Sequence, residues 1–402
     1  MPDPTADLKH HFRAVRDPRI ERSKEHRLLD IIVIAICGTI AGANSWVDIA
    51  EWGSSHRAWL ERFLDLPHGI PSHDTFGRVF ARLAPQQFQA AFGAWVATVA
   101  SLTAGQVVAV DGKLARGSYD THHGHAARRM ISAWATHNRL VLGQRRVEAD
   151  SNEIEAVPEL LKLLALKGCL VTLDAMGCQT EIAQTIVDQG ADYILAVKDN
   201  QPTLAADLTD LFERRSTSDW ATWQTDYHRS VSKGHGRLEI REVWMVTDPD
   251  WLSYLNPKQR WPNLHAVVLV RAERHIGAKV EVGHHYFITS LTTPAQRLGR
   301  AIRRHWRIEN SLHWVLDVSF REDDSRVRVG HGPENLVVLR PIALNLLQRE
   351  KTAKRGIHGK RLKAAWDTDY LLKVLTPLTT FDAIALAPPL RYLPLGAVSG
   401  IL

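Results

Sequence analysis

The sequence has little cysteine, and the cysteines that it has form no pattern. Its 402 residues include three, Cys37, Cys169 and Cys178. None lies in a Cys-x-x-Cys pair and an odd number cannot pair completely, so the sequence offers neither a disulfide framework nor cysteine ligands spaced for zinc. A reducing, intracellular environment fits this usage best.

Long hydrophobic runs are also missing. The most apolar run, Leu28 to Ala43, is shorter than the ~20 residues needed to span a bilayer and contains Asp30. The N-terminus, MPDPTADLKHHF, lacks the basic-then-apolar order of a signal peptide. We therefore expect no membrane partner and a cytoplasmic protein.

Positive charge is in excess and gathers late in the chain. The formal net charge is +6, and basic residues cluster at Arg300–Arg307 and Lys351–Lys363. A polyanion such as DNA is the partner that such clusters favour, although a solvated helix end explains each cluster about as well in isolation. The candidate DNA-binding residues are Lys354, Arg355, Lys360 and Arg361 in the later cluster, and Arg303, Arg304 and Arg307 in the earlier one.

Apolar spacing divides the chain into a helical N-terminal part and an α/β part. Residues 1–103 carry helical periodicity, with Ser72 as a candidate N-cap and Pro85 opening a further helix. This part is a DNA-binding or a dimerisation domain, and the sequence favours neither. From Gln106 the order becomes strand, strand, strand, helix, strand, helix, strand, helix, which predicts a mixed sheet with helices on both faces.

The α/β pattern is interrupted and then resumes. Between 216 and 293 the helical signal is lost and strand-like runs appear, so we predict a β-rich insertion between catalytic segments 104–215 and 294–330. Basic C-terminal helices are expected over 331–376, and an irregular tail over 377–402.

Two aspartates follow short β-branched runs, Asp111 in VVAVDGK and Asp174 in LVTLDAMG. Strand ends are where open α/β sheets bind ligands, and adjacent strands would bring these carboxylates together. A turn or helix-cap acid is the simpler explanation for either residue alone.

A third acid, Glu309, lies within a predicted helix over Leu298–Leu316. At ~100° per residue its arginines share one stripe, and Glu309 projects from the opposite, apolar face. A carboxylate placed there needs a cation, a hydrogen-bond partner or a proton, because burying it unpaired costs several kcal/mol. The alternative explanations are a buried ion pair with an arginine and a glutamate whose carboxylate reaches solvent at the edge of a cleft.

The three acids together predict a site for a hard cation. Three carboxylates suit Mg²⁺ or Mn²⁺, and two such ions ~3.5–4 Å apart stabilise the attacking and leaving oxygens of phosphodiester cleavage or transfer. A second acidic group follows in FREDDSR, which is typical of a solvated loop; the acids that rank second are Asp317, Glu322, Asp323 and Asp324. Lys113 and Lys198 follow the strands and are candidates to touch phosphate.

Five stretches resemble the ISAs-type insertion-sequence transposases, which include the H-repeat-associated proteins beside Rhs elements. They are IPSHDTFGRVFARL, VVAVDGKLARGS, SNEIEAVPELL, LVTLDAMGCQTEIA and HWRIENSLHWVLDVSFREDDSR. The resemblance runs from about Asp17 to Leu375. It implies a DDE transposase with a ribonuclease-H-like catalytic domain, in which Asp111, Asp174 and Glu309 are the catalytic, metal-binding acids.

The resemblance also implies the partners of the protein. The sequence departs from the family pattern in one place. Double-stranded DNA, both the terminal repeats of an element and the target, is the expected substrate of a homo-oligomer at the bacterial nucleoid. Many DDE relatives place Tyr, Arg and Lys around the glutamate where this chain has Ile302, His305 and Leu316. The alternatives are a metal-dependent nuclease without strand transfer, a catalytically silent DNA-binding remnant and a metal hydrolase of another substrate.

Overall fold

The computed structural model describes residues 5–376 except 101, 103, 116–127, 148–150, 215–221 and 235. The tail expected to be irregular, 377–402, lies outside the described residues. None of the helices in the described part is long and apolar enough to cross a membrane.

The N-terminal segment is helical, as its periodicity predicts. Leu28–Ile40 is apolar all round, and this helix is buried on nearly every side because other helices surround it. Ser72 caps its helix as expected, its side chain accepting a hydrogen bond from the backbone N–H of Thr75. The helices are α1 (Ala6–Phe12), α2 (Leu28–Ile40), α3 (Trp46–Ser55), α4 (Arg57–Leu60), α5 (His73–Arg82) and α6 (Pro85–Val99).

A nine-stranded mixed sheet runs from the middle of the molecule to one end, in the order β3-β2-β1-β4-β5-β9-β8-β7-β6. In its first half β1 pairs antiparallel with β2 and β2 with β3, while β1, β4 and β5 run parallel. This is the ribonuclease-H-like order that the resemblance implies. The strands of this half are β1 (Val107–Ala115), β2 (Arg128–Ala135), β3 (Leu140–Val147), β4 (Leu170–Leu173) and β5 (Asp192–Val197).

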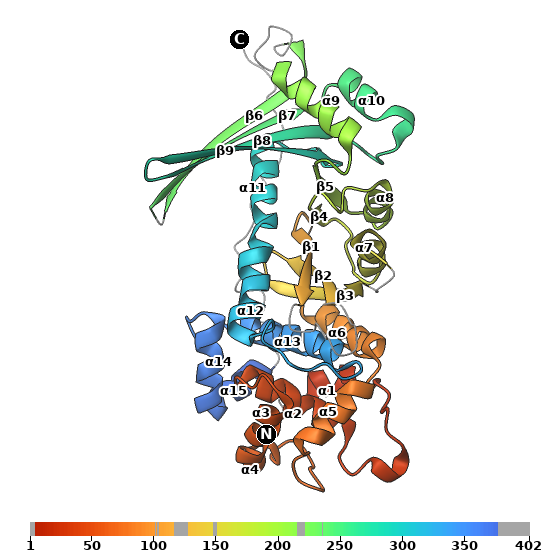
Figure 1. Ribbon diagram of the computed structural model, residues 1–402, viewed down its shortest axis with the longest axis vertical. Helices are drawn as coiled ribbons and strands as arrows, with labels where there is room; N and C mark the ends of the chain where they lie inside the picture. The colour runs from red at the N-terminus through yellow and green to blue at the C-terminus, as the bar shows by residue number, and fades with distance from the viewer. Residues whose placement is uncertain are drawn as a thin grey trace, which may run out of the picture.

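The β-rich segment continues this same sheet. Its last strand pairs antiparallel with β5, Ile194 lying opposite Thr289, and the other three strands follow as antiparallel neighbours. Figure 1 shows these strands at one end of the molecule, opposite the N-terminal helices. They are β6 (Thr225–Gly234), β7 (Arg237–Val246), β8 (Ala266–Ile276) and β9 (Lys279–Thr289).

The loss of helical signal across 216–293 missed one helix, α10 (Pro249–Leu255). Asp248 caps it by accepting hydrogen bonds from the backbone N–H groups of Asp250 and Trp251, and Pro249 occupies its first turn. Capping residues were therefore the better signal here, because a helix this short has too few turns to show a period.

Helices cover both faces of the sheet. α7 (Glu153–Lys162) and α8 (Thr180–Asp188) lie on one face and α11 (Ala295–His305) runs along the other (Figure 1). α9 (Pro202–Glu213) follows β5. The α11 face is sealed by a separate apolar cluster that includes Val107, Val243 and Leu298.

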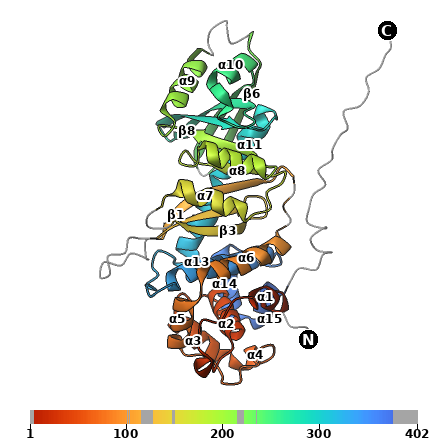
Figure 2. The ribbon, with the colours of Figure 1, turned by 90° about the vertical axis from the view of Figure 1, so that its right-hand side faces the viewer.

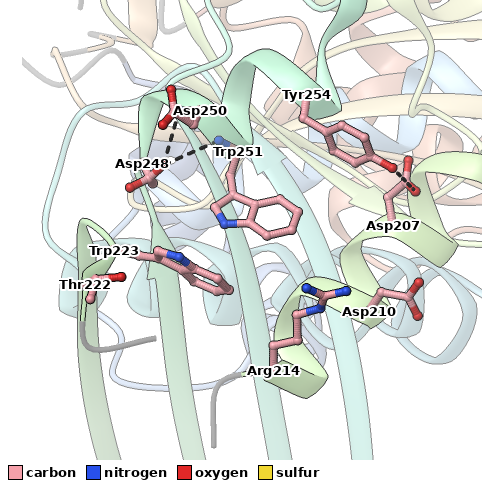
Figure 3. Close-up of a pocket in the computed structure, with 9 residues that line it drawn as sticks. All are labelled: Asp207, Asp210, Arg214, Thr222, Trp223, Asp248, Asp250, Trp251 and Tyr254. Carbon is pink, nitrogen blue, oxygen red and sulfur yellow. Dashed lines mark hydrogen bonds between the residues drawn. The ribbon is translucent and has the colours of Figure 1, made fainter. Parts of the chain in front are cut away.

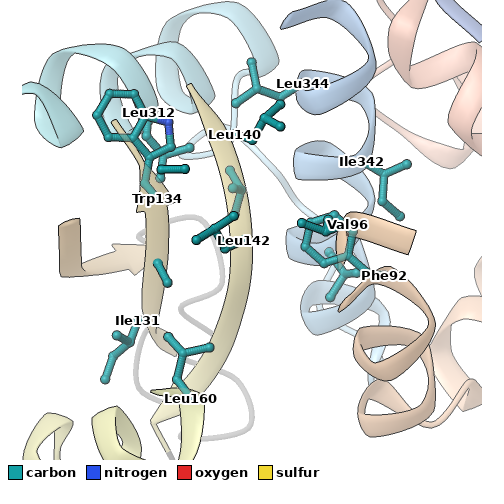
Figure 4. Close-up of a cluster of buried hydrophobic side chains, with 14 of the residues drawn as sticks. Phe92, Val96, Ile131, Trp134, Leu140, Leu142, Leu160, Leu312, Ile342 and Leu344 are labelled. Atoms are coloured by element: carbon teal, nitrogen blue, oxygen red, sulfur yellow. The ribbon is translucent and has the colours of Figure 1, made fainter. Parts of the chain in front are cut away.

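The C-terminal helices lie against the N-terminal helices, as Figure 2 shows. They are α12 (Trp314–Phe320), α13 (Gly332–Arg349), α14 (Ile357–Trp366) and α15 (Thr368–Leu375). α13 is almost wholly buried, between β3 on one side and α2, α5 and α6 on the other. Figure 4 shows the resulting shared core, in which Leu140 and Leu142 of β3 stand between Trp134 of β2 and Ile342 and Leu344 of α13.

Candidate active site

Asp111 and Asp174 occupy matching positions on two neighbouring parallel strands. The β1–β4 pairing ends with Val110 opposite Leu173, so each aspartate is the next residue on its strand. The expectation that the first strand ends at Asp111 is wrong, because β1 continues to Ala115 as a partner of β2 alone. Asp111 thus lies where β1 loses one of its two neighbours and the sheet opens.

Asp111 carries a negative charge that its surroundings do not neutralise. Its side chain is 18% exposed, and its Oδ1 accepts one hydrogen bond, 2.9 Å from the backbone N of Gly112. Burial, followed by the charges of Asp174, Glu309 and Glu153, raises the pKa of Asp111 to about 7. Four carboxylates therefore share one electrostatic environment, where a proton or a cation is favoured.

Glu309 lies in a π-helical turn, Glu309–His313, between α11 and α12. Leu298, Ile302, Leu312 and Leu316 are buried as the periodicity predicts. Glu309 itself is exposed, so the prediction that it projects from the apolar face is wrong. The carboxylate of Glu309 is within electrostatic reach of Asp111.

Two histidines of the same helical segment lie at the site; His305 was noted from the sequence only as a departure from the family pattern, and His313 was not singled out. The ring Nδ1 of His313 lies 3.7 Å from Oδ2 of Asp111, and that of His305 lies 3.0 Å from the Thr172 hydroxyl. Burial, followed by the nearby Lys113 cation, lowers the pKa of His313 to about 4, so this imidazole is neutral. The signal available in the sequence was that these two histidines stand four residues before and four residues after Glu309, a spacing that places side chains on one side of a helix.

A buried ion network begins two residues after Asp111. The ammonium group of Lys113 donates hydrogen bonds to the carboxylates of Asp317 and Glu322. Glu322 also pairs with Arg340, 3.5 Å away. The Lys113, Glu322 and Arg340 side chains are 12%, 4% and 5% exposed.

This network corrects two sequence expectations. Lys113 holds helix α12 and the following loop against β1, so its ammonium group is not placed to meet phosphate. FREDDSR is not simply a solvated loop, because Glu322 is buried within it. Burial pushes the pKa of Glu322 up, but Lys113 and Arg340 outweigh that effect and hold it below its usual range.

The arginine stripe of α11 and of the residues that follow it faces outward. Arg303, Arg304 and Arg307 are all exposed. None of the three forms a hydrogen bond or ion pair with another residue that the structure describes. Their cationic groups are therefore open beside the carboxylates of the same helical segment.

The later basic cluster divides into two kinds of residue. Lys354 and Arg355 are exposed, in the loop before α14. Lys360 is buried and donates to the Leu347 carbonyl at 2.8 Å, and Arg361 is buried and donates to the Thr39 carbonyl at 2.8 Å.

The assignment of Lys360 and Arg361 to a DNA surface is thereby corrected. Lys360 also pairs with Glu350, and Arg361 also donates to the Ser319 carbonyl at the end of α12. The guanidinium of Arg361 lies 4.3 Å from the centre of the Phe320 ring. Both cations join helices within the core, which a run of basic letters cannot reveal.

A cavity of about 350 Å³ opens beside Asp174. Lys198, His285 and Trp306 line it over an apolar floor that includes Ile194 and Phe287. Lys198 thus lines the same cavity as Asp174, consistent with its position after β5.

Another cavity, of about 590 Å³, lies between α9 and α10 and contains none of the predicted site residues. Figure 3 shows that Asp207, Asp210, Asp248 and Asp250 surround it with Trp223 and Trp251. The lining also includes the cation of Arg214, but four carboxylates outnumber it and repel an anionic ligand, so this cavity is poorly suited to phosphate.

A divalent cation fits the donors at the strand ends in chemistry. Within the described residues, no three His, Cys, Asp or Glu side chains already converge as a finished metal site. Asp111, Asp174 and Glu309 nevertheless offer only carboxylate oxygens, the donors that Mg²⁺ and Mn²⁺ prefer. The like-charge repulsion at Asp111 is what such an ion relieves.

Comparison with known families matches nearly the whole described chain. The model described as "Transposase DDE domain" matches residues 103–346, and the model described as "DDE_Tnp_1-associated" matches residues 9–96. The first alone spans more than half of the chain.

Individual proteins agree with this match. The "H repeat-associated putative transposase YhhI" of Escherichia coli (strain K12) is 38% identical over 372 residues, covering 92% of this chain and 97% of that protein. "Putative transposase YncI" of Escherichia coli O157:H7 is 37% identical over 369 residues, covering 92% and 94%. A cryo-EM structure of the piggyBac transposase synaptic complex with hairpin DNA is similar at a TM-score of 0.41 and 10% identity, covering 97% of this chain and 86% of that one. That structural likeness is too low to bear on the assignment, but the family models and the relatives suffice: the chain belongs to the transposases with a DDE domain.

Proposed function

We propose that the chain is the DNA transposase of an insertion sequence, which cuts the element's ends and transfers their 3′-OH strands to target DNA. The observation that carries this proposal is the register of β1 and β4, which sets Asp111 beside Asp174 at the opening of the sheet. The raised pKa of Asp111 supports it, because an unneutralised carboxylate cluster is what a cation-dependent site requires.

Asp111, Asp174 and Glu309 are the proposed holders of Mg²⁺ or Mn²⁺, two ions in all. When bound, the two ions polarise a phosphodiester and stabilise both the entering and the leaving oxygen of an in-line displacement. The neutral imidazole of His313 packs beside Asp111 without adding charge. Cleavage and joining use the same kind of displacement, so one set of carboxylates serves both steps.

Exposed arginines of α11 are the proposed phosphate contacts. Arg303, Arg304 and Arg307 are free cations on the helical segment that carries Glu309. DNA held there brings its backbone to the carboxylates, and neutralising phosphates releases counterions. Lys354 and Arg355 are proposed as a second contact on the same grounds of exposure.

The biological setting follows from this substrate. Transposition requires two element ends to be held together, so we propose a homo-oligomer on DNA, in the bacterial cytoplasm at the nucleoid. The role of residues 1–103 as a DNA-binding or a dimerisation domain stays a prediction.

The test incubates the purified protein with a plasmid that carries the repeats flanking its own gene, in Mg²⁺, Mn²⁺ or EDTA. We expect cuts at the repeat ends and joined products in either metal, and neither in EDTA or with Asp174→Ala. Asp188→Ala, which removes an exposed acid on α8, is the matched control and keeps both activities.

The other outcomes separate the alternative functions. Cuts without joined products would identify a nuclease. Specific binding by a folded protein without any cutting would identify a silent DNA-binding protein and would remove the catalytic role from all three acids.

A further inference from the structure

A fourth carboxylate, Glu153, lies against the backbone beside Asp111. Glu153 is the first residue of α7, whose N-cap Asn152 accepts a hydrogen bond from the backbone N–H of Glu155. A methyl group added at Gly112 would meet the Glu153 Oε1 at 2.5 Å. The side chain is only 15% exposed, so it points into the site rather than into solvent.

Glu153 shares a small cavity with the two strand aspartates. The space is about 10 Å³ in volume, and Asp111, Glu153 and Asp174 line it together with Gly112 and Gly177. That is roughly the room of a single water molecule or ion, since one probe sphere of water size needs ~10–15 Å³. Three carboxylates around so small a space favour a cation in it.

A purely structural role explains Glu153 less well. An acid in the first turn of a helix is stabilised by the helix dipole, and the Nε of Arg129 lies 3.3 Å from Oε1. Burial nevertheless outweighs Arg129 and, with the charge of Asp174, raises the pKa of Glu153. Arg129 is 48% exposed, so solvent screens this pair and leaves the carboxylate incompletely neutralised.

We propose that Glu153 is a fourth carboxylate of the metal site and binds a divalent ion together with Asp111 and Asp174. This inference rests on the proposed function, because it assigns a further ligand to the same site. It also gives Gly112 a reason: any side chain there would occupy the position of the Glu153 carboxylate. Glu153 lies on α7, so the site draws its donors from both faces of the sheet.

The test measures metal binding without DNA or turnover. The midpoint of thermal unfolding is followed against Mn²⁺ concentration for the full chain, since a ligand that binds only the folded state raises that midpoint. We expect Glu153→Gln to weaken the apparent Mn²⁺ affinity by about tenfold or more, in the range that loss of a supporting metal-site group produces. Glu155→Gln, an exposed acid two residues along the same helix, is the matched control and leaves the affinity unchanged.

Asp111→Asn in the same titration separates a failure of the fourth ligand from a failure of the proposed metal site. If Asp111→Asn loses Mn²⁺ binding but Glu153→Gln keeps the wild-type affinity, the fourth ligand is wrong and the proposed function stands. If neither substitution changes the affinity, the metal site itself is misplaced.

Gly112→Ala provides a second route to the same carboxylate, should Glu153→Gln fold poorly. The added methyl displaces the flexible end of Glu153, so we expect the Mn²⁺ affinity to fall as in Glu153→Gln. The double variant should bind no more weakly than either single one, because both changes remove one interaction. Additive losses in the double variant would mean that Gly112 acts independently of Glu153 and would overturn the proposal.

Discussion

Two groups of charged residues meet on strand β1 and are built in opposite ways. Around Asp111, burial and the charges of the acids Asp174, Glu309 and Glu153 raise its pKa, and the main opposing effect is the hydrogen bond from the Gly112 backbone N–H. Two residues further on, Lys113 and Arg340 face Asp317 and Glu322. The group around Asp111 has an excess of negative charge, and we call it the unbalanced group. The group around Lys113 pairs cations with acids, and we call it the balanced group.

This difference distinguishes the acids that we propose to bind a metal ion from the acids that hold the fold together. A buried ion pair with matched charges holds its elements together but has no capacity left for a ligand. An unmatched carboxylate cluster weakens the metal-free fold, and a bound cation would offset that cost. On this comparison we propose that Asp317 and Glu322, which ranked second from the sequence, are structural and that Asp111 and Asp174 are functional.

The largest expected effect comes from breaking the balanced group. Lys113→Met leaves Asp317 and Glu322 without their shared cation, so we expect the free energy of unfolding to fall by about 3–5 kcal/mol. Chemical denaturation in EDTA measures it. Lys279→Met, which breaks an exposed pair with Glu281, should lower the free energy of unfolding far less, because solvent screens an exposed pair. Equal losses in the two variants would refute the distinction.

A somewhat smaller effect is expected at Arg361, a buried cation satisfied by carbonyl oxygens rather than acids. Arg361→Met leaves the carbonyls of Thr39 and Ser319 without their donor, and we expect a loss of about 2–4 kcal/mol in the free energy of unfolding. Arg355→Met, at an exposed position, should leave stability unchanged. A stable Arg361→Met variant that binds DNA poorly would restore the original assignment of Arg361.

Substitution of Asp111, in the unbalanced group, should raise the stability of the metal-free protein rather than lower it. The folded-state pKa of Asp111 is about 7, above its ordinary value of 3.8, so the folded protein binds more protons than the unfolded chain between these pH values. Its stability therefore falls as pH rises from about 4 to 7 and is constant above. Asp111→Asn removes this penalty and should stabilise the metal-free protein by about 2–4 kcal/mol at pH 8, and by almost nothing at pH 4.

Thermal unfolding in EDTA at the two pH values measures this difference. A destabilised Asp111→Asn at pH 8 would show that Asp111 has a partner and belongs with the balanced group.

The smallest effect is expected at the free arginines of α11. Arg303→Ala should weaken binding to duplex DNA to a similar extent for all sequences and lower the slope of log K against log [salt] by about 1, the contribution of one phosphate contact. Its unfolding midpoint should not change, since the side chain is exposed and unpaired. An unchanged salt slope would remove Arg303 from the DNA surface.

The sequence predicted what depends on local pattern. The β-branched runs before Asp111 and Asp174 identify two strands, and the order of elements predicts a mixed sheet. Asp111 and Asp174 are selected because the acids follow the apolar stretches directly. Ser72 and Pro85 mark helix starts for the same local reason.

What the sequence missed depends on contacts between distant segments. Lys113 meets Glu322 and Arg361 meets Thr39 across more than two hundred residues, and no periodicity encodes such pairs. The exposure of Glu309 was misjudged because helical spacing alone does not show where a buried face opens to solvent. Glu153 was overlooked because its approach to Gly112 appears only once α7 is packed on the sheet.

Single-turnover cleavage of the element's ends in Mg²⁺, with Asp111→Asn and Asp317→Asn as a matched pair, tests the central claim most directly. Both substitutions remove one carboxylate charge, and the two acids lie on either side of the comparison. We predict that Asp111→Asn abolishes cleavage while the metal-free fold becomes more stable. Asp317→Asn should still cleave DNA at a temperature where it is folded. Cleavage by Asp111→Asn, or its loss in a folded Asp317→Asn, would contradict the account.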